Sequence, residues 1–250
     1  KAKVLALVKD DVLDLKKRYG DPRRTSICEA EHKGAKLEDL RMAARVLAGR
    51  KVGLTSLAMQ QQLGVDSPDF GFFTDDLVFA DGADIEVSRF IAPKVEPELA
   101  FILGSDLAAD ATIEDVHAAI ASTHLAVEII DSRVRDWDIR LVDTVADNAS
   151  CGAVILDRTP VDVSLEDLPK VTAEMSIGGD LAGSGTGSDV MGHPLAPLHW
   201  LAGVLGEQGV PLKAGDIVLT GSFCGAAPVV AGQSVEVDYG PYGRLSATFI

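Results

Sequence analysis

Residues 93–103 read PKVEPELAFIL and decide the fold, because they set two carboxylates into an apolar strand. Apolar residues fall on both faces of the extended chain, which is typical of a buried β-strand. Glu96 and Glu98 are two apart, so their side chains point the same way, about 7 Å apart along the backbone. The stretch therefore predicts a buried strand with two carboxylates on one face.

Two unpaired anions on a buried strand are costly, or they take up protons. A bound divalent cation resolves the conflict, because Mg²⁺, Mn²⁺ and Ca²⁺ take oxygen ligands. The alternative is an edge strand with both glutamates on its wet face. Pro97 allows that alternative, since proline is confined to sheet edges and bulges. An E-x-E pair is common, so this spacing alone leaves both interpretations open.

Residues 125–130, LAVEII, repeat the pattern with a single carboxylate, Glu128, in an apolar strand. With Glu96 and Glu98 it makes a three-oxygen site that leaves positions open for water and substrate, as Mg²⁺ and Mn²⁺ sites usually do. The sequence therefore favours a metal site on these glutamates. Pro97 would then bend the strand so that both of its glutamates reach one ion.

Composition excludes several classes of function. The chain has 250 residues, 47% of them hydrophobic, with a net charge of −15. This charge argues against a nucleic-acid partner and an anionic membrane, but not against a small anionic substrate, because a bound cation inverts the local field. The cysteines are three and far apart, so neither a zinc site nor a disulfide framework is indicated. The expected compartment is the reducing cytoplasm.

The chain divides near residue 50. Residues 1–50 predict a helical N-terminal region. Residues 51–250 predict a domain rich in short strands between glycine turns, which the resemblance described below implies to be catalytic. Helices are predicted over 37–47, 113–122 and 194–205, with a helical turn over 59–63. Strands are predicted from 51 and over 78–85, 89–91, 93–103, 125–130, 168–177, 181–183, 217–220, 234–238 and 245–249.

Four other positions are candidates for the site. Lys51 heads an apolar strand, either as a snorkelling surface residue or to meet an anion. Asp69, in the loop PDFG, offers a carboxylate, although turn chemistry alone would explain it. Ser150 lies in the small polar run DTVADNASCG and holds a ligand or only braces a loop. Ser222 follows a strand, where backbone amides can line a pocket.

Seven stretches, in this order, resemble the 2-hydroxypenta-2,4-dienoate (2-keto-4-pentenoate) hydratases of the fumarylacetoacetate hydrolase superfamily, which also includes 4-oxalocrotonate decarboxylases. The resemblance covers about residues 51–250. The stretches are KVGLTSLAMQQQLGVDSPDFG (51–71), PKVEPELAFIL (93–103), LAVEIIDSRVRDW (125–137), DTVADNASCG (143–152), GHPLAPLHWLA (192–202), KAGDIVLTGS (213–222) and the ending GRLSATFI.

The resemblance implies an α+β fold, a mixed β-roll of the fumarylacetoacetate hydrolase C-terminal type. It also implies a homo-oligomer (pentamer or decamer), with association with a downstream aldolase or a paralogous decarboxylase. The implied site residues are Glu96, Glu98 and Glu128 as ligands of Mg²⁺ or Mn²⁺, Lys51 and Asp69 as catalytic residues, and Lys51, Ser150, Thr220 and Ser222 as substrate contacts.

The implied reaction is metal-dependent hydration of 2-hydroxypenta-2,4-dienoate, or of a C5-substituted analogue, to 4-hydroxy-2-oxopentanoate in aromatic or steroid ring catabolism. Lys51 and Asp69 would move the protons, and either one would activate water. A cation and an apolar strand beside Lys51 predict a lowered pKa.

Four alternatives remain. DSRVRDW and NASCG match the pentadienoate hydratases, whereas GSF (221–223) and VDYG (237–240) resemble hydratases of a longer 2-oxo-hept-3-ene-dioate. A 4-oxalocrotonate-type decarboxylase would use the same metal and lysine. A C–C bond hydrolase would need a histidine–carboxylate pair, which the contexts of the five histidines do not favour. The non-enzyme alternative is a metal-stabilised structural partner in a complex.

Overall fold

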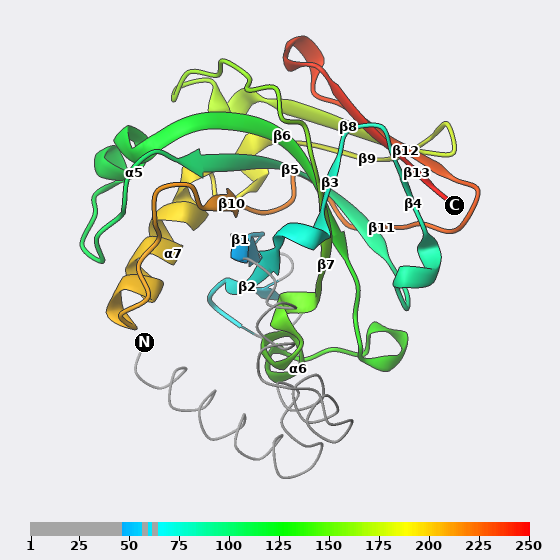
Figure 1. The fold of residues 1–250 in the computed structure, drawn as a ribbon, viewed down its shortest axis with the longest axis horizontal. Coiled ribbons are helices and arrows are strands. Elements are labelled where there is room, and N and C mark those ends of the chain that lie inside the picture. The colour runs from blue at the N-terminus through cyan, green and yellow to red at the C-terminus, as the bar shows by residue number, and fades with distance from the viewer. Residues whose placement is uncertain (1–46, 57–59, 62–64) are drawn as a thin grey trace, which may run out of the picture. The chain divides into compact units, whose positions relative to one another are not determined.

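Two mixed β-sheets carry the described part of the chain, which is residues 47–56, 60–61 and 65–250 of a computed structural model (Figure 1). The predicted helical region 1–50 lies outside the described residues apart from residues 47–50, which are strand. The predicted turn over 59–63 is described only at residues 60 and 61. Within the described residues, no helix is both long and apolar enough to span a membrane.

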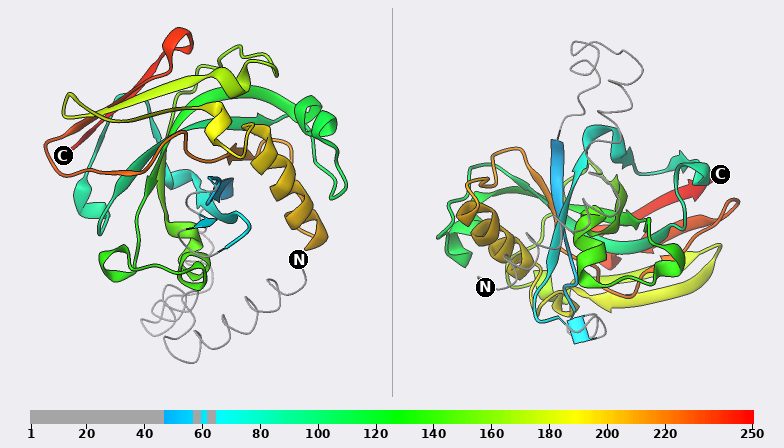
Figure 2. Two further views of the ribbon diagram at one scale, coloured as in Figure 1. Left: turned by 180° about the vertical axis from the view of Figure 1, so that it is seen from behind. Right: turned by 90° about the horizontal axis from the view of Figure 1, so that it is seen from below.

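The larger sheet has eight strands in the order β2-β1-β10-β5-β6-β7-β3, with β11 also paired to β5. Its long strands β5 and β6 are antiparallel over their whole length and lie at its centre. The sheet curls, so that β2, at one edge, contacts β7 (Figure 2). The strands are β1 (Leu47–Gly53), β2 (Asp69–Thr74), β3 (Val78–Ala80), β5 (Lys94–Leu103), β6 (Ile120–Ile130), β7 (Cys151–Leu156), β10 (Ile217–Leu219) and β11 (Ala227–Pro228).

The smaller sheet has five strands in the order β4-β13-β12-β8-β9. They are β4 (Ala83–Ile85), β8 (Thr172–Ile177), β9 (Asp180–Thr186), β12 (Ser234–Asp238) and β13 (Arg244–Phe249). The main core lies between the sheets, where Val95 and Leu99 of β5 share one buried cluster with Met175 and Val237. The opposite face of β5, with its glutamates, is turned away from this core.

Three α-helices complete the described fold: α5 (Ile113–Ala119), α6 (Leu141–Ala146) and α7 (Leu195–Glu207). Thr112 and Asp115 form a capping box that begins α5. α7 contacts both α5 and β1, and buries its leucines at 195, 198, 201 and 205. Mixed sheets with few helices agree with the α+β fold class that the sequence predicts.

The strand at 93–103 is confirmed, but several boundaries differ from the prediction. The helix predicted over 113–122 ends at Ala119, because residues 120–130 pair along β5 and pairing overrides helical propensity. The strand predicted over 78–85 is wrong. It breaks at Gly82, whose φ is +74°, into β3 and β4 of different sheets. Residues 89–91 are not a strand either, because a 3-10 turn spans Val87–Arg89.

Candidate metal centre and active site

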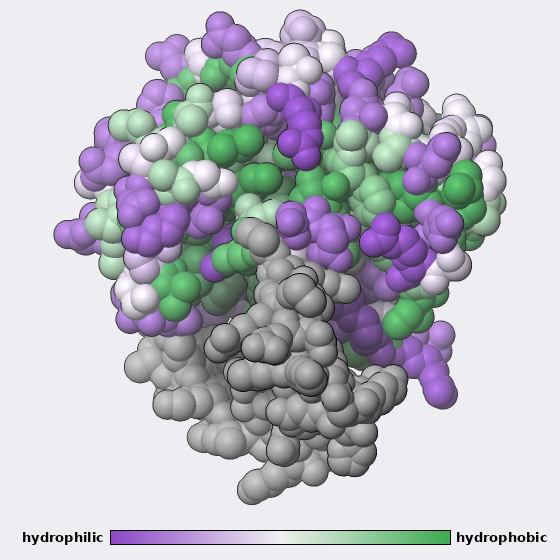
Figure 3. Space-filling view, in the orientation of Figure 1, coloured by the Kyte–Doolittle hydropathy of each residue, from purple (hydrophilic) through white to green (hydrophobic). Residues whose placement is uncertain are grey.

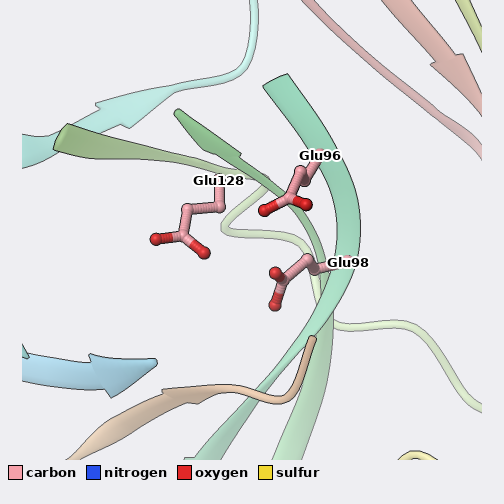
Figure 4. Close-up of side chains that lie close together, drawn as sticks. All are labelled: Glu96, Glu98 and Glu128. Carbon is pink, nitrogen blue, oxygen red and sulfur yellow. The ribbon is translucent and has the colours of Figure 1, made fainter. Parts of the chain in front are cut away.

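The glutamates of β5 and β6 face one another. The antiparallel register sets Glu96 directly opposite Glu128 and Glu98 opposite Ala126. Each glutamate offers a carboxylate oxygen, and the three oxygens all lie within 4.8 Å of one another. Figure 4 shows the three side chains converging from the two strands. The grouping predicted from separate stretches of sequence is therefore present in the fold.

These carboxylates are buried against their own electrostatic preference. Glu98 and Glu128 are each 1% exposed, and Glu96 is half-buried. Like charges directly opposite on paired strands destabilise a sheet. Burial and the charge of Glu128 raise the pKa of Glu96 to about 7 and the pKa of Glu98 well above its usual range. Burial also raises the pKa of Glu128, although Lys51 opposes the shift. The cluster therefore favours a positive charge at its centre.

The hydrogen bonds of the glutamates leave some carboxylate oxygens free to bind a cation. Oε2 of Glu98 accepts from the Gly221 N–H at 2.8 Å. Among the described residues, neither carboxylate oxygen of Glu128 has a hydrogen-bond partner, and Oε1 has an ion pair with Nζ of Lys51 at 3.2 Å. Buried polar atoms are rarely left without a partner, and carboxylate oxygens are the ligands that hard divalent cations prefer. The three carboxylates therefore fit a divalent metal ion as its oxygen ligands.

Pro97 does not mark a sheet edge. β5 is a central strand, and the carbonyl of Pro97 accepts a hydrogen bond from the Phe223 N–H at 2.9 Å. Pro97 lies between the β5 segments that pair with β11 and with β10, so no ladder hydrogen bond requires its missing N–H. The alternative of a wet edge strand is therefore wrong.

Lys51 points into the same cluster from β1. Its Nζ lies 3.2 Å from Oε1 of Glu128 and donates to the Ala149 carbonyl at 2.8 Å. The residue is 3% exposed, which rules out snorkelling to the surface. Burial lowers the pKa of Lys51, but the charges of Glu128 and Asp69 outweigh burial and raise it. The lowered pKa predicted from the sequence stays a prediction, because it refers to the site with a cation bound. The charge of that cation would offset those of Glu128 and Asp69.

Asp69 is brought beside Lys51 by the pairing of β1 with β2. The register sets Asp69 opposite Gly53. Lys51 is two residues before Gly53 on β1, so it lies on the same face of that strand as Gly53. Asp69 is 6% exposed, and its Oδ2 accepts a hydrogen bond from the Thr144 hydroxyl. A Cβ on Gly53 would lie 2.4 Å from Oδ1 of Asp69 and 3.2 Å from Nζ of Lys51. Gly53 therefore provides the space in which these two charged groups meet.

The hydroxyl groups of the candidate substrate contacts differ in whether they already have a hydrogen-bond partner. Thr220 follows β10, which pairs with both β1 and β5, and it is fully buried. Within the described part of the chain, its hydroxyl has no hydrogen-bond partner. Ser222 donates to the Cys224 carbonyl at 2.6 Å, and Ser150 lies 3.5 Å from a carboxylate oxygen of Asp147. Of these hydroxyls, the structure leaves that of Thr220 available for a ligand.

Three residues that build the site do not follow from the sequence. They are Gly53, Thr144 and Tyr239, and each acts through a partner distant in sequence. The buried Tyr239 hydroxyl contacts the Ala126 carbonyl at 2.7 Å and the Glu98 carbonyl at 3.1 Å, and so fixes the backbones of β5 and β6. The stretches DTVADNASCG and VDYG contain two of these residues, but no pattern within them shows their partners.

Comparisons with known proteins agree with this geometry. Residues 47–250 match the family model described as fumarylacetoacetate (FAA) hydrolase C-terminal. The chain is 45% identical over 206 residues to 2-keto-4-pentenoate hydratase 1 of Dechloromonas aromatica, covering 82% of this chain and 78% of that protein. It is 42% identical over 204 residues to 2-hydroxyhexa-2,4-dienoate hydratase of Comamonas testosteroni, covering 80% and 77%.

A solved structure is similar over the whole chain. It is the 4-oxalocrotonate decarboxylase of Pseudomonas putida G7 complexed with magnesium and adipate, with 32% identity, a TM-score of 0.79, and coverage of 100% of this chain and 98% of that one. The family model and the hydratase relatives each cover more than two thirds of the sequence. The chain therefore belongs to the fumarylacetoacetate hydrolase family, within which it is similar to the 2-keto-4-pentenoate hydratases.

Proposed function

We propose that the chain is a hydro-lyase that hydrates 2-hydroxypenta-2,4-dienoate, or a C5-substituted analogue, to 4-hydroxy-2-oxopentanoate in aromatic or steroid ring catabolism. The observation that carries this proposal is the placement of Lys51 and Asp69 beside the three facing glutamates. A 2-oxo acid offers two adjacent oxygens to a metal ion, and the reaction needs proton donors and acceptors beside it. The hydratase relatives support the choice of reaction.

Glu96, Glu98 and Glu128 would hold the ion, which we propose to be Mg²⁺ or Mn²⁺. Three carboxylates with open positions suit either metal. The related decarboxylase is complexed with magnesium, which supports this choice. When bound, the ion supplies Lewis-acid stabilisation of negative charge on the C2 oxygen of the substrate.

Lys51 and Asp69 would divide the proton transfers. The charges of Glu128 and Asp69 raise the pKa of Lys51 and keep Nζ positive, so it can pair with the substrate carboxylate. A bound cation would offset that shift and allow Nζ to give up a proton. Oδ2 of Asp69 accepts from Thr144, while Oδ1 lies on the side of Gly53. We propose that Asp69 takes a proton from the water that adds at C4. The C2 hydroxyl loses its proton as one is delivered to C5 to form the ketone, and the proton that Asp69 takes from water balances the one delivered to C3, so one molecule of water is consumed overall.

Other contacts complete the proposal. Thr220, with its free hydroxyl, is the proposed substrate contact with most structural support, and Ser150 and Ser222 would contribute only if their local hydrogen bonds open.

Hydrophobic residues lie among hydrophilic ones on the face seen in Figure 3. A homo-oligomer, such as the pentamer or decamer expected above, is part of the proposal. Association with an aldolase or a paralogous decarboxylase is also proposed.

Decarboxylation of a 2-oxo-3-enedioate is the second candidate, favoured by the full-length similarity to 4-oxalocrotonate decarboxylase. It would use the same metal site and Lys51. Release of CO₂ from that substrate, measured against hydration of hydroxypentadienoate by the same preparation, separates the two reactions. A predominance of CO₂ release would replace the hydratase proposal.

Metal removal should stop turnover. We expect EDTA-treated protein to lose its hydratase activity and to regain it with Mg²⁺ or Mn²⁺, because the ion stabilises the charge that develops on the C2 oxygen. The measurement is the ultraviolet absorbance of the dienoate, with substrates that carry hydrogen, alkyl or carboxymethyl at C5. Full activity after EDTA treatment would disprove the metal's role.

Gly53→Ala should displace Asp69 and Lys51. The new Cβ would lie 2.4 Å from Oδ1 of Asp69, whose other oxygen is held by Thr144. We expect kcat/KM to fall about 100-fold, since displacements near 1 Å cost that much, and stability to fall by about 1–3 kcal/mol. The matched control is Gly203→Ala in α7, where the nearest atom is the Ala109 oxygen at 3.6 Å, an ordinary contact. Equal activities of the two variants would contradict this assignment.

A further inference from the structure

One turn beside the site has a left-handed backbone. Asn148, Ala149 and Ser150 are consecutive residues with φ of 56°, 52° and 53°. Left-handed backbone costs about 1–2 kcal/mol per residue for most L-amino acids, and asparagine is among the few that tolerate it. Such conformations persist only where the surroundings over-determine them, and they gather at functional sites. The contacts that hold this turn therefore indicate its purpose.

The Asn148 side chain anchors the turn to β2. Its Oδ1 accepts from the Phe72 N–H at 2.9 Å, and its Nδ2 donates to the Phe72 carbonyl at 2.8 Å. These two bonds imitate the pairing of a neighbouring strand, and β2 is an edge strand. Gly71 permits the approach, because a Cβ there would lie 2.3 Å from the Asn148 carbonyl oxygen. Asn148 therefore joins the edge of the curled sheet to the segment that enters β7.

The other end of the turn is also held. The Ser150 carbonyl accepts from the Asp131 N–H at 2.8 Å, and the Ser150 N–H donates to the Asp147 carbonyl at 3.0 Å. Asp147 is itself paired with Arg133, whose Nε lies 2.6 Å from Oδ1. The turn is thus fixed on both sides, with Ala149 between the two anchors.

The result of this arrangement is the direction of one carbonyl. The Ala149 carbonyl accepts a hydrogen bond from Nζ of Lys51 at 2.8 Å, and the same ammonium group pairs with Glu128. A right-handed turn between the same anchors would direct that carbonyl elsewhere. We propose that Asn148 is a positioning residue, which holds the left-handed turn so that the Ala149 carbonyl orients Lys51 toward the glutamates. This inference rests on the proposed role of Lys51 in proton transfer.

Asn148→Gly tests the proposal, because glycine accepts the left-handed backbone but lacks the amide that bridges Phe72. We expect kcat/KM to fall about 10- to 100-fold, mainly in kcat, with the affinity for Mn²⁺ within about twofold of wild type, since a small misplacement of a reacting group costs up to about 100-fold. A second readout needs no substrate. Acetylation of Lys51 by acetic anhydride, followed by mass spectrometry relative to the exposed Lys213, should be faster in the variant.

Asp136→Gly is the matched control, because Asp136 is also a left-handed residue, with φ of 58°, but is exposed and has no contact with Lys51 among those described. Its activity and Lys51 acetylation should stay within about twofold of wild type, because glycine accepts the same left-handed backbone. If Asn148→Gly does not fold, Asn148→Asp, which keeps the acceptor for Phe72 and loses the donor, takes its place. Wild-type values of kcat/KM and of Lys51 acetylation in the Asn148 variant that is tested would overturn the proposal. If the wild-type protein hydrates no dienoate, the hydratase proposal fails, while the acetylation ratio still decides whether Asn148 orients Lys51.

Discussion

Lys51→Met is expected to lower kcat for dienoate hydration by about 10²- to 10⁴-fold, the range that a positioned acid or base supplies. The methionine fills a similar volume but has no proton to deliver and no charge to pair with the substrate carboxylate. Lys51 is buried, pairs with Glu128 and donates to Ala149, so its loss removes a positive charge held directly against the carboxylate cluster. The measurement is the decay of dienoate absorbance at saturating Mn²⁺.

Lys51→Arg separates the two roles of the charge. A guanidinium keeps the positive charge but does not release its proton at working pH. If Lys51 only pairs with the carboxylate, the arginine variant should recover much of the activity. We expect it instead to bind substrate with nearly unchanged KM and to turn over as slowly as Lys51→Met, because proton transfer is lost in both.

The matched control is Lys213→Met. Lys213 forms a surface ion pair with Asp106, with both side chains more than half exposed, so its loss should leave kcat unchanged. Metal binding by Lys51→Met should persist, because all three glutamates remain. A kcat within tenfold of wild type in Lys51→Met would contradict a role for Lys51 in proton transfer.

The grouping of the three candidate metal ligands could be predicted from the sequence because their signal is local. Each glutamate stands in an apolar run where a charge is costly, and that conflict is visible without knowing any partner. The structure confirms that Glu96, Glu98 and Glu128 meet, since β5 and β6 pair in the register that sets Glu96 opposite Glu128. The confirmed strand at 93–103 has the same origin.

Other features depend on pairing that the sequence does not display. β2 begins at Asp69 in a stretch that resembles a turn, and only its pairing with β1 makes it a strand. The helix predicted to Ser122 loses its end to β6 for the same reason. The left-handed turn at 148–150 is set by its bonds to Phe72 and Asp131, which are distant in sequence.

The electrostatics of Lys51 show a further limit. Its raised pKa follows from the positions of Glu128 and Asp69, which no local pattern in the sequence shows, whereas the predicted lowered pKa refers to an apolar strand beside a bound cation. Gly53 was missed for a related reason. A glycine gives no signal of the two charged side chains that need its space.

Glu128→Gln should lose the metal and with it the reaction. Glu128 is buried and faces Glu96 across the strands, and within the described residues Lys51 is the ion-pair partner of its Oε1 while Oε2 has no hydrogen-bond partner. An amide offers one neutral oxygen in place of a carboxylate, so we expect metal affinity to fall about 100-fold or more, and turnover to fall below detection at wild-type metal concentrations. The variant should still fold, because glutamine fills the same volume without a buried charge.

A thermal shift measures the loss independently of turnover. Metal at 100 times its Kd stabilises wild type by about 2.7 kcal/mol, which raises the melting temperature by about 5–10 °C for a domain of this size. Glu128→Gln should show almost none of that shift, whereas the control Glu174→Gln, exposed on β8, should keep all of it. A full shift in Glu128→Gln would exclude Glu128 as a ligand. A full shift in wild type with no turnover of any 2-oxo acid would instead support the non-enzyme alternative, in which the same triad stabilises a structural protein.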